Sequence, residues 1–272
     1  MRVVLAALFC VLAVLASGCG RETVDPAEIA AAAEASASAG TAKVTIEGEG
    51  KARGQTFDLD GTGEMDGTRS EFEMGLPGGA GTMRQVADGF VVYTHVPGVE
   101  EQLGKEWTRV DMVEAYRKLG IDLALVGQPG SQDPRQILEQ LKNSGNEIEK
   151  VGTDTVRGVE TTHYRGDMEM RSAVERAPAA RRAEAERMVE KVIKLSGTEG
   201  FPMDVWVDDD KLVRKMRIQM KLNNPAFGGE LEMDMTMELF DYGEPVSVDV
   251  PSEDEAQDVT DAVTQALAQQ LD

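Results

Sequence analysis

The sequence predicts an α+β protein in which antiparallel strands dominate and a few helices interrupt or follow the strand runs. Short stretches of alternating polar and apolar residues recur along most of the chain, and turn sequences such as Asp88-Gly89 join neighbouring stretches. Helix-start sequences occur at only a few positions. A hydrophobic content of 41% is that of a globular chain, and the length fits one large domain or two small ones.

The N-terminal stretch is typical of a targeting segment. One positive charge precedes an apolar run from Val3 to Ala16, shorter than the roughly 20 residues that a membrane helix needs. Leu15 to Gly18, before Cys19, resembles the bacterial lipobox, in which cleavage before the cysteine accompanies attachment of a diacylglyceryl group to its sulfur. We therefore expect a signal peptide at residues 1–18, a lipidated tether at 19–25 and a single folded domain at 26–272. Ordinary secretion and an uncleaved anchor are the alternatives.

The net charge limits the electrostatic partners of the protein, and the cysteine content limits how the fold can be stabilised. The net charge is −21, which argues against nucleic acid and against anionic membrane surfaces as electrostatic partners. Cleavage before Cys19 would remove Cys10 and leave a single cysteine. No intramolecular disulfide could then form, so stability must come from the core.

The stretch from Leu212 to Tyr242 is the most informative, because it predicts two strands joined by a loop at residues 223–230. Apolar and charged residues alternate along both strands. One register gives the pairs Leu222–Leu231, Lys221–Glu232, Met220–Met233, Met216–Met237 and Lys215–Glu238. A slip of one residue would destroy both faces. We expect a hairpin with one charged face and one face rich in methionine, a flexible side chain that adapts to irregular apolar partners.

Other elements follow from periodicity and capping residues. Strands are expected around Ala42–Ile46, Phe57–Met65, Phe72–Leu76, Met83–Ala87, Phe90–Val96, Gly104–Val110, Glu147–Thr153, Val159–Met170 and Phe201–Val207. Helices are expected at residues 26–39, 112–119, 134–142 and 178–195, and from a Ser252–Glu255 capping box onward. The apolar segment Gly120–Gly127 either packs under the helices or forms a flap at a cavity mouth.

Catalytic, metal and nucleotide motifs are not expected. His95 and His163 are the two histidines, and neither has a partner at ligand spacing, so both are interpreted as strand residues. Gly48-Glu-Gly50 and Gly61-Thr-Gly63 lie inside strand patterns rather than before a helix. The acidic stretches 58–60 and 208–210 are interpreted as turns, because they lack the spaced ligands of a calcium loop.

Three features of the chain carry a family resemblance. They are residues 137–142 followed by 152–164, residues 204–208 leading into Leu212-Val213-Arg214, and the lipobox at Cys19. Together they resemble the actinobacterial LppX/LprAFG lipoprotein family, whose members have the LolA/LolB-like fold. The resemblance implies an incompletely closed antiparallel β half-barrel, lidded by α-helices, whose concave apolar face holds acyl chains of lipids or glycolipids. It implies no catalytic residue and no cofactor.

The methionine-rich face of the hairpin would line that concavity. The expected lining residues are Met168, Met170, Met203, Val205, Met216, Ile218, Met220, Leu222, Leu231, Met233, Met235, Met237 and Leu239. A half-barrel filled by its own helices needs the same apolar face, so a lipid cavity and a dry core both remain open. The two function classes are a lipid carrier or chaperone of the cell envelope, anchored outside the cytoplasmic membrane and aided by a transport partner, and a non-catalytic scaffold lipoprotein.

Overall fold

A computed structural model describes residues 22–24, 26–52, 54–122, 148–224 and 229–271. The strands are β1 (Glu22–Val24), β2 (Thr41–Ala52), β3 (Gln55–Asp66), β4 (Arg69–Gly75), β5 (Thr82–Asp88), β6 (Val91–His95), β7 (Trp107–Asp111), β8 (Ile148–Val156), β9 (Val159–Glu169), β10 (Gly200–Asp208), β11 (Val213–Asn224), β12 (Gly229–Phe240) and β13 (Ala256–Asp258).

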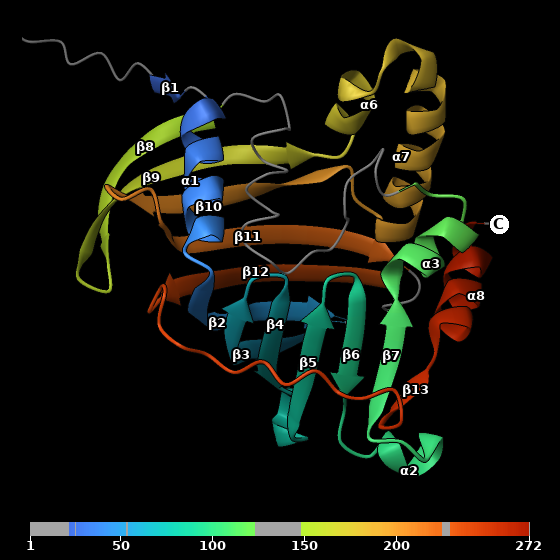
Figure 1. The fold of residues 1–272 in the computed structure, drawn as a ribbon. Coiled ribbons are helices and arrows are strands. Elements are labelled where there is room, and N and C mark those ends of the chain that lie inside the picture. The colour runs from blue at the N-terminus through green and yellow to red at the C-terminus, as the bar shows by residue number, and fades with distance from the viewer. Residues whose placement is uncertain (1–21, 25, 53, 123–147, 225–228, 272) are drawn as a thin grey trace, which may run out of the picture.

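In this described part of the chain the strands form one sheet in the order β1-β8-β9-β10-β11-β12-β2-β3-β4-β5-β6-β7-β13. Neighbours are antiparallel except for β13, which runs parallel to β7. The sheet curves around a concave inner face, and its end strands β1 and β13 lie far apart (Figure 1). The predicted α+β architecture, an incompletely closed antiparallel half-barrel, is confirmed.

The register predicted for the central hairpin is confirmed. β11 and β12 pair through Lys215–Glu238, Met216–Met237, Met220–Met233, Lys221–Glu232 and Leu222–Leu231. On the charged face Lys221 Nζ lies 2.9 Å from Glu232 Oε1. One pair differs in its contacts: Glu238 binds Arg157 of the β8–β9 turn at 2.9 Å, whereas the Lys215 ammonium lies over an indole ring.

Glycines on the inner face allow the strands to coil tightly. A Cβ added at Gly48 of β2 would lie 2.2 Å from the backbone oxygen of Asp234, and one at Gly61 of β3 would lie 2.5 Å from that of Glu73. Both glycines pair with inward-facing residues of their neighbours. Glycine in a strand interior marks close backbone approach or bending. The two Gly-x-Gly stretches therefore belong to strands, as predicted, and favour curvature.

The helices are α1 (Pro26–Ser38), α2 (Glu100–Leu103), α3 (Met112–Lys118), α6 (Ser172–Arg176), α7 (Arg182–Ser196) and α8 (Thr260–Leu271), with 3-10 turns η1 (Pro77–Gly79) and η2 (Ala179–Arg181). α1 ends at Ser38, and Gly40 follows it with a φ of 80°, a left-handed conformation that suits glycine. The Asp111 carboxylate caps α3 by accepting from the backbone N–H of Glu114 at 2.9 Å, as predicted.

The helices occupy two places on the sheet. α1 lies across the inner face, while α3, α7 and α8 stand together at one end of the half-barrel (Figure 1). α1 contributes Ile29 and two alanines to the main core. The other group has its own small core, which includes Ile121 and Leu195. Ile121 is buried there, which supports packing beneath helices for the described start of the Gly120–Gly127 segment.

The C-terminal segment differs from the prediction. Ser252 and Glu255 form the hydrogen bonds of a capping box, with the Ser252 N–H and hydroxyl donating to Glu255 Oε2 at 2.9 and 2.7 Å, but these bonds close a turn. β13 follows the turn, and α8 begins only at Thr260. The predicted helix start was wrong because the free edge of β7 offers backbone hydrogen bonds to residues 256–258.

The C-terminal segment also covers part of the outer face. In Figure 1 it crosses in front of β3 to β7 before it reaches β13. Val248 and Ala256 from this segment pack with Val86, Tyr93 and Trp107. This second core lies on the side of the sheet opposite the methionines, since Val86 and Tyr93 pair on that side.

Two acidic stretches were interpreted as turns, and one interpretation is wrong. Asp58 and Asp60 lie inside β3, which continues through them because β2 pairs along its whole length. The stretch 208–210 does begin the turn into β11. There the Asp208 carboxylate accepts from Leu212 N at 2.8 Å and from Arg214 Nε at 2.6 Å, so it closes the turn itself.

Several sequence-based predictions lie outside the described residues. They are the signal peptide at 1–18, Cys19, the helix at 134–142 and the rest of the segment that ends at Gly127. In the part of the chain that the structure describes, no helix combines the length and hydrophobicity needed to cross a membrane.

Candidate functional site

The candidate site is the inner face of the sheet, whose residues fall into rows across the strands. One row runs Val205, Met216, Met237, Ile46, Gly61 and Met74, and the next runs Met203, Ile218, Met235, Gly48 and Leu59. These rows join the predicted methionine face of the hairpin to apolar residues of β2, β3 and β4. The register thus extends the apolar face well beyond the hairpin.

Part of this face is a closed core. Met203, Val205, Met216, Ile218, Met237 and Leu239 are each at most 4% exposed, and Met168 and Leu231 are also buried. Except for Leu231 they form one cluster with Ile29, Ala32 and Ala33 of α1. Small alanines let α1 approach the sheet closely, so side chains under this helix pack against each other at interior density. Beneath α1 the inner face is therefore a dry core, filled by the protein's own side chains.

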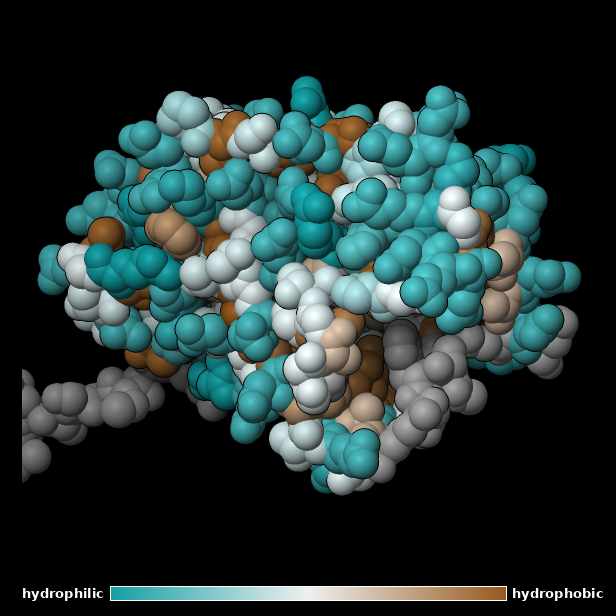
Figure 2. Space-filling view, turned by 90° about the horizontal axis from the view of Figure 1, so that it is seen from below, coloured by the Kyte–Doolittle hydropathy of each residue, from teal (hydrophilic) through white to brown (hydrophobic). Residues whose placement is uncertain are grey.

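Farther along the same strands the face is more open. Met220 and Met235 are only partly buried and pack at the border of the core, while Leu222 and Met233 are also half-buried. Phe57, from β3, continues this open part. Seen from below, the surface is mainly hydrophilic but includes a hollow in which hydrophobic residues are visible (Figure 2).

Phe57 lies over a glycine that leaves room for it. A Cβ at Gly50 would lie 2.2 Å from the tip of the Phe57 ring, and Gly63 is likewise covered by the ring of Phe72. Alternation of glycine and aromatic residues therefore lets large apolar side chains lie flat on the sheet instead of rising from it. The inner face stays shallow and apolar in this region.

A pocket of about 590 Å³ adjoins the open part of the hairpin. Met220, Met233 and Gly50 contribute to it, but most of its described lining comes from the charged rows, including Glu232 and Lys221. This pocket therefore has a mixed charged and apolar lining and belongs mainly to the outer side of the sheet. It is not the concavity predicted from the sequence.

Met170 lies apart from the other predicted lining residues. It follows the end of β9 and packs with the small core of α3, α7 and α8. Ser196 of α7 donates its hydroxyl toward the Met170 sulfur at 3.9 Å. The strand pattern placed Met170 with Met168, but β9 stops at Glu169, so the alternation no longer applies.

The outer face carries a polar cluster that the sequence analysis missed. Asp204, buried in β10, accepts from His163 Nε2 at 2.6 Å and from Arg165 Nε at 2.8 Å. The His163 ring stacks on Trp206, with ring centroids 4.2 Å apart. The β9–β10 register pairs His163 with Trp206 and Arg165 with Asp204. The alternation of these residues along both strands was the available signal, but their register was not predicted.

A second ion pair holds the hairpin on this face. Arg217 Nε and its terminal nitrogen lie 2.7 and 2.5 Å from the two carboxylate oxygens of Asp234. These hydrogen bonds hold the pKa of Asp234 below its usual value and raise the pKa of Arg217. Both partners are partly exposed, so the pair acts as a surface contact that fixes register.

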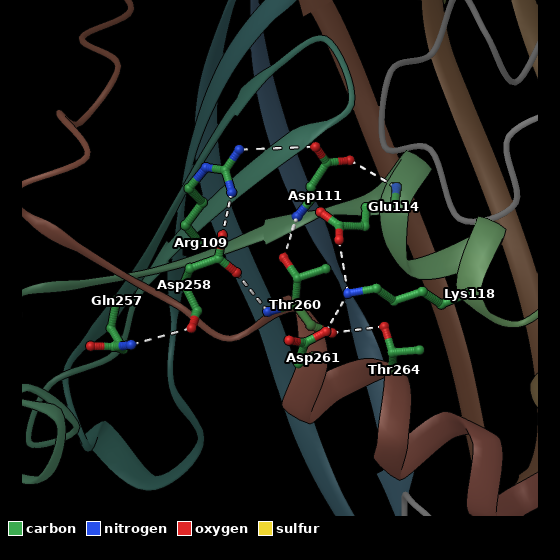
Figure 3. A network of polar contacts seen from close by, with 9 residues as sticks. All are labelled: Arg109, Asp111, Glu114, Lys118, Gln257, Asp258, Thr260, Asp261 and Thr264. Atoms are coloured by element: carbon green, nitrogen blue, oxygen red, sulfur yellow. Dashed lines mark hydrogen bonds and ion pairs between the residues drawn. The ribbon is translucent and has the colours of Figure 1, made fainter.

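A polar network fastens the C-terminus to the rest of the fold (Figure 3). Arg109 of β7 binds Asp258 of β13 at 2.5 Å, and Lys118 of α3 binds Asp261 of α8. The Thr260 hydroxyl accepts from the backbone of β7 between these two ion pairs. The network links elements that are distant in sequence, and its role is structural. In the described ranges no group of three or more His, Cys, Asp or Glu is placed to hold a metal.

No family model matches the chain. A relative from Streptomyces griseus, an uncharacterized 31.2 kDa protein of the rplA-rplJ intergenic region, is 26% identical over 170 residues. The match covers 61% of this chain and 52% of that protein, so the chain spans about half the length of the curated relative it matches.

Several solved structures are similar in fold. LprF from Mycobacterium bovis is 12% identical with a TM-score of 0.45, covering 86% of this chain and 100% of that structure. LppX from Mycobacterium tuberculosis is 15% identical with a TM-score of 0.44, covering 83% and 100%. A LolA superfamily protein from Nitrosomonas europaea is 8% identical with a TM-score of 0.33, covering 86% and 99%. These proteins are of the kinds that the sequence was found to resemble. The assignment of the half-barrel rests on the strand pairing of this chain itself.

Proposed function

We propose that the protein is an acylated lipoprotein on the extracytoplasmic face of the cell membrane that holds apolar chains of a lipid or glycolipid on its inner face. It acts as a carrier or chaperone for that lipid in the cell envelope and catalyses no reaction. The observation that carries the proposal is the continuation of the apolar inner face beyond the area that α1 covers.

The open part of the inner face supports binding for two reasons. Apolar surface left in water costs about 25 cal/mol for each Å², so a ligand that covers Met220, Met233 and Met235 gains free energy. Methionine side chains also adapt to partners of irregular shape, such as acyl chains. The buried part beneath α1 supplies the rigid floor against which this adaptable part is held.

Met220→Trp tests binding against a dry core. In a ligand site the indole fills space that the lipid uses, so binding of a lipophilic fluorescent probe should weaken at least tenfold while the free energy of unfolding changes by less than about 1 kcal/mol. Probe titration and urea unfolding measure the two quantities.

Lys221→Trp is the matched control, because it adds an indole one residue away on the charged face. It should leave probe binding unchanged. A dry core predicts a different result for Met220→Trp: a loss of about 1–3 kcal/mol of stability from a parent protein that never bound the probe. That result would favour the scaffold function instead.

Cys19→Ala tests the membrane anchor. Without the sulfur that carries the lipid, the protein should leave the membrane fraction or remain as an uncleaved precursor. Cys10→Ala, inside the apolar run of the signal peptide, is the control and should change neither processing nor membrane association. Detergent partitioning and the mass of the mature protein decide the outcome, and unchanged behaviour of Cys19→Ala would exclude acylation.

A further inference from the structure

We infer that the edge of the sheet formed by β1 and β8 is the surface that lies against the membrane, held there by the short chain between Cys19 and β1. The inference rests on the proposed function, in which Cys19 is acylated. The partner is the phospholipid bilayer that holds the acyl chains. Three features of this edge support it: its distance from Cys19 along the chain, an exposed apolar side chain at a β-bulge, and its balance of charge.

The chain allows little distance between the anchor and the sheet. β1 begins at Glu22, inside the segment 19–25 that the sequence predicted as a tether. Glu22 is three residues beyond Cys19, a separation that spans at most about 10 Å. The polar layer of one bilayer leaflet is about 6 Å thick, so this span brings the first residue of β1 to the membrane surface. The tether is therefore too short to hold the folded body away from the bilayer.

The strand register identifies the part of the edge that is nearest to the anchor. β1 and β8 are antiparallel, and Glu22 pairs with Lys150. Val151 is the next residue of β8. Because paired strands lie about 4.8 Å apart, Val151 is no more than about 17 Å from Cys19. At the far end of the sheet, β13 lies well away from β1, so the elements beside it face away from the membrane in this orientation (Figure 1).

Val151 is an exposed apolar residue at a β-bulge. The β8–β9 register passes from Lys150 to Gly152 and leaves Val151 out of the pairing. Bulges of this kind redirect a side chain. Val151 is 48% exposed, whereas Val156, at the other end of β8, is buried. Exposed apolar residues on edge strands are usually covered, and a bilayer within reach of the tether would cover this one.

The charges of this edge favour contact with a bilayer over the rest of the surface. Glu22 and Glu149 are matched in number by Lys150 and by Arg165, the β9 partner of Glu149. Lys150 is exposed, and the Arg165 side chain is 53% exposed. The whole chain has a net charge of −21, so an average part of its surface is repelled by anionic lipids. The β1–β8 edge avoids this repulsion.

Labels at two valines of similar exposure test the orientation. In the mature acylated protein Cys19 carries the lipid, so Val151→Cys and Val113→Cys each introduce one free thiol for an NBD label. Val113 is 46% exposed and lies on α3, at the opposite end of the sheet (Figure 1). Both proteins are reconstituted in phosphatidylcholine vesicles with TEMPO-labelled headgroups. Fluorescence at position 151 should fall at least about twofold, because the tether keeps it close to the headgroups, while position 113 should keep its fluorescence.

The other outcomes are distinct. Equal quenching at both positions, or stronger quenching at position 113, would overturn the inference while leaving the anchor intact. A signal at position 151 that follows protein density in vesicles without TEMPO would assign the edge to a second copy of the chain, and would also overturn it. Flotation with the vesicles is measured first. A protein that does not float contradicts the acylation in the proposed function instead.

A longer tether provides the second measurement. Insertion of Gly-Ser-Gly-Ser-Gly-Ser between Arg21 and Glu22 triples the separation of three residues from Cys19 and lowers the effective concentration of the edge at the membrane about fivefold. The quenched fraction at position 151 should fall at least about twofold. Flotation and probe binding should not change, because Cys19 and the inner face are untouched. Quenching as strong as without the insertion would show that the tether does not hold this edge, and would overturn the inference.

Discussion

Replacement of Gly48 by alanine is expected to destabilise the protein by about 3 kcal/mol or more. The new Cβ would lie 2.2 Å from the backbone oxygen of Asp234 and 2.9 Å from the Cα of Met235. Both atoms belong to the backbone of β12, which is held by β11 on its other side. The strands would have to separate, and overpacking of a well-packed region commonly costs 1–3 kcal/mol even where side chains can adjust.

Gly50→Ala offers a graded comparison on the same strand and face. Its Cβ would meet the tip of the Phe57 ring rather than backbone, and a ring can turn aside. The expected cost is therefore smaller, about 1–2 kcal/mol. Glu47→Ala, on the exposed outer side of β2, should change stability by no more than about 0.5 kcal/mol. Urea unfolding ranks the three variants, and a Gly48→Ala variant as stable as Glu47→Ala would contradict the close approach of β2 and β12.

The hairpin could be predicted because its information is local. Two strands close in sequence alternate charged and apolar residues, and a single register satisfies both faces. The partner of Glu238 could not be predicted in the same way, because Arg157 comes from a turn far along the chain. Local periodicity thus fixes which residues share a face, while the identity of each ion pair depends on strand order.

In the C-terminal segment, by contrast, a prediction made from local sequence was wrong. Its capping box is a correct local feature, yet β13 forms because β7 has a free edge, and that edge exists only after the sheet has assembled. Local capping and tertiary pairing compete for the same residues, and pairing prevails. The sequence around Ser252 and Glu255 contains no information about the free edge of β7, so the helix start predicted from it could not take this pairing into account.

The candidate site was likewise predictable only in part from local sequence. Alternation placed the methionines of β11 and β12 on one inner face, but it could not tell which of them α1 covers. Met216 is fully buried beneath α1, while Met220, four residues farther along β11 on the same face, is only partly buried. The distinction between packed core and open face depends on where a small-faced helix docks, which is a tertiary property.

Asp204→Ala is expected to cost about 3 kcal/mol, because it removes the carboxylate that both His163 and Arg165 use. Asp204 is 4% exposed, and removal of this buried hydrogen-bond acceptor leaves the donors of His163 and Arg165 without a partner. Arg165 is half-exposed and can turn toward water, so most of the loss should come from His163. Trp206 stacks on His163 and is one of two tryptophans, so its fluorescence should report the loosened ring.

Asp210→Ala is the control, since it removes the same charge from an exposed turn two residues beyond β10 and should cost no more than about 0.5 kcal/mol. A double-mutant cycle with His163→Ala isolates the pair, and its coupling energy should exceed about 1 kcal/mol. Lipid binding should survive in Asp204→Ala under conditions where the variant is folded, because the cluster lies on the outer face while the methionines face inward. Equal stability of the Asp204→Ala and Asp210→Ala variants would show that the buried carboxylate does not stabilise the β9–β10 pair.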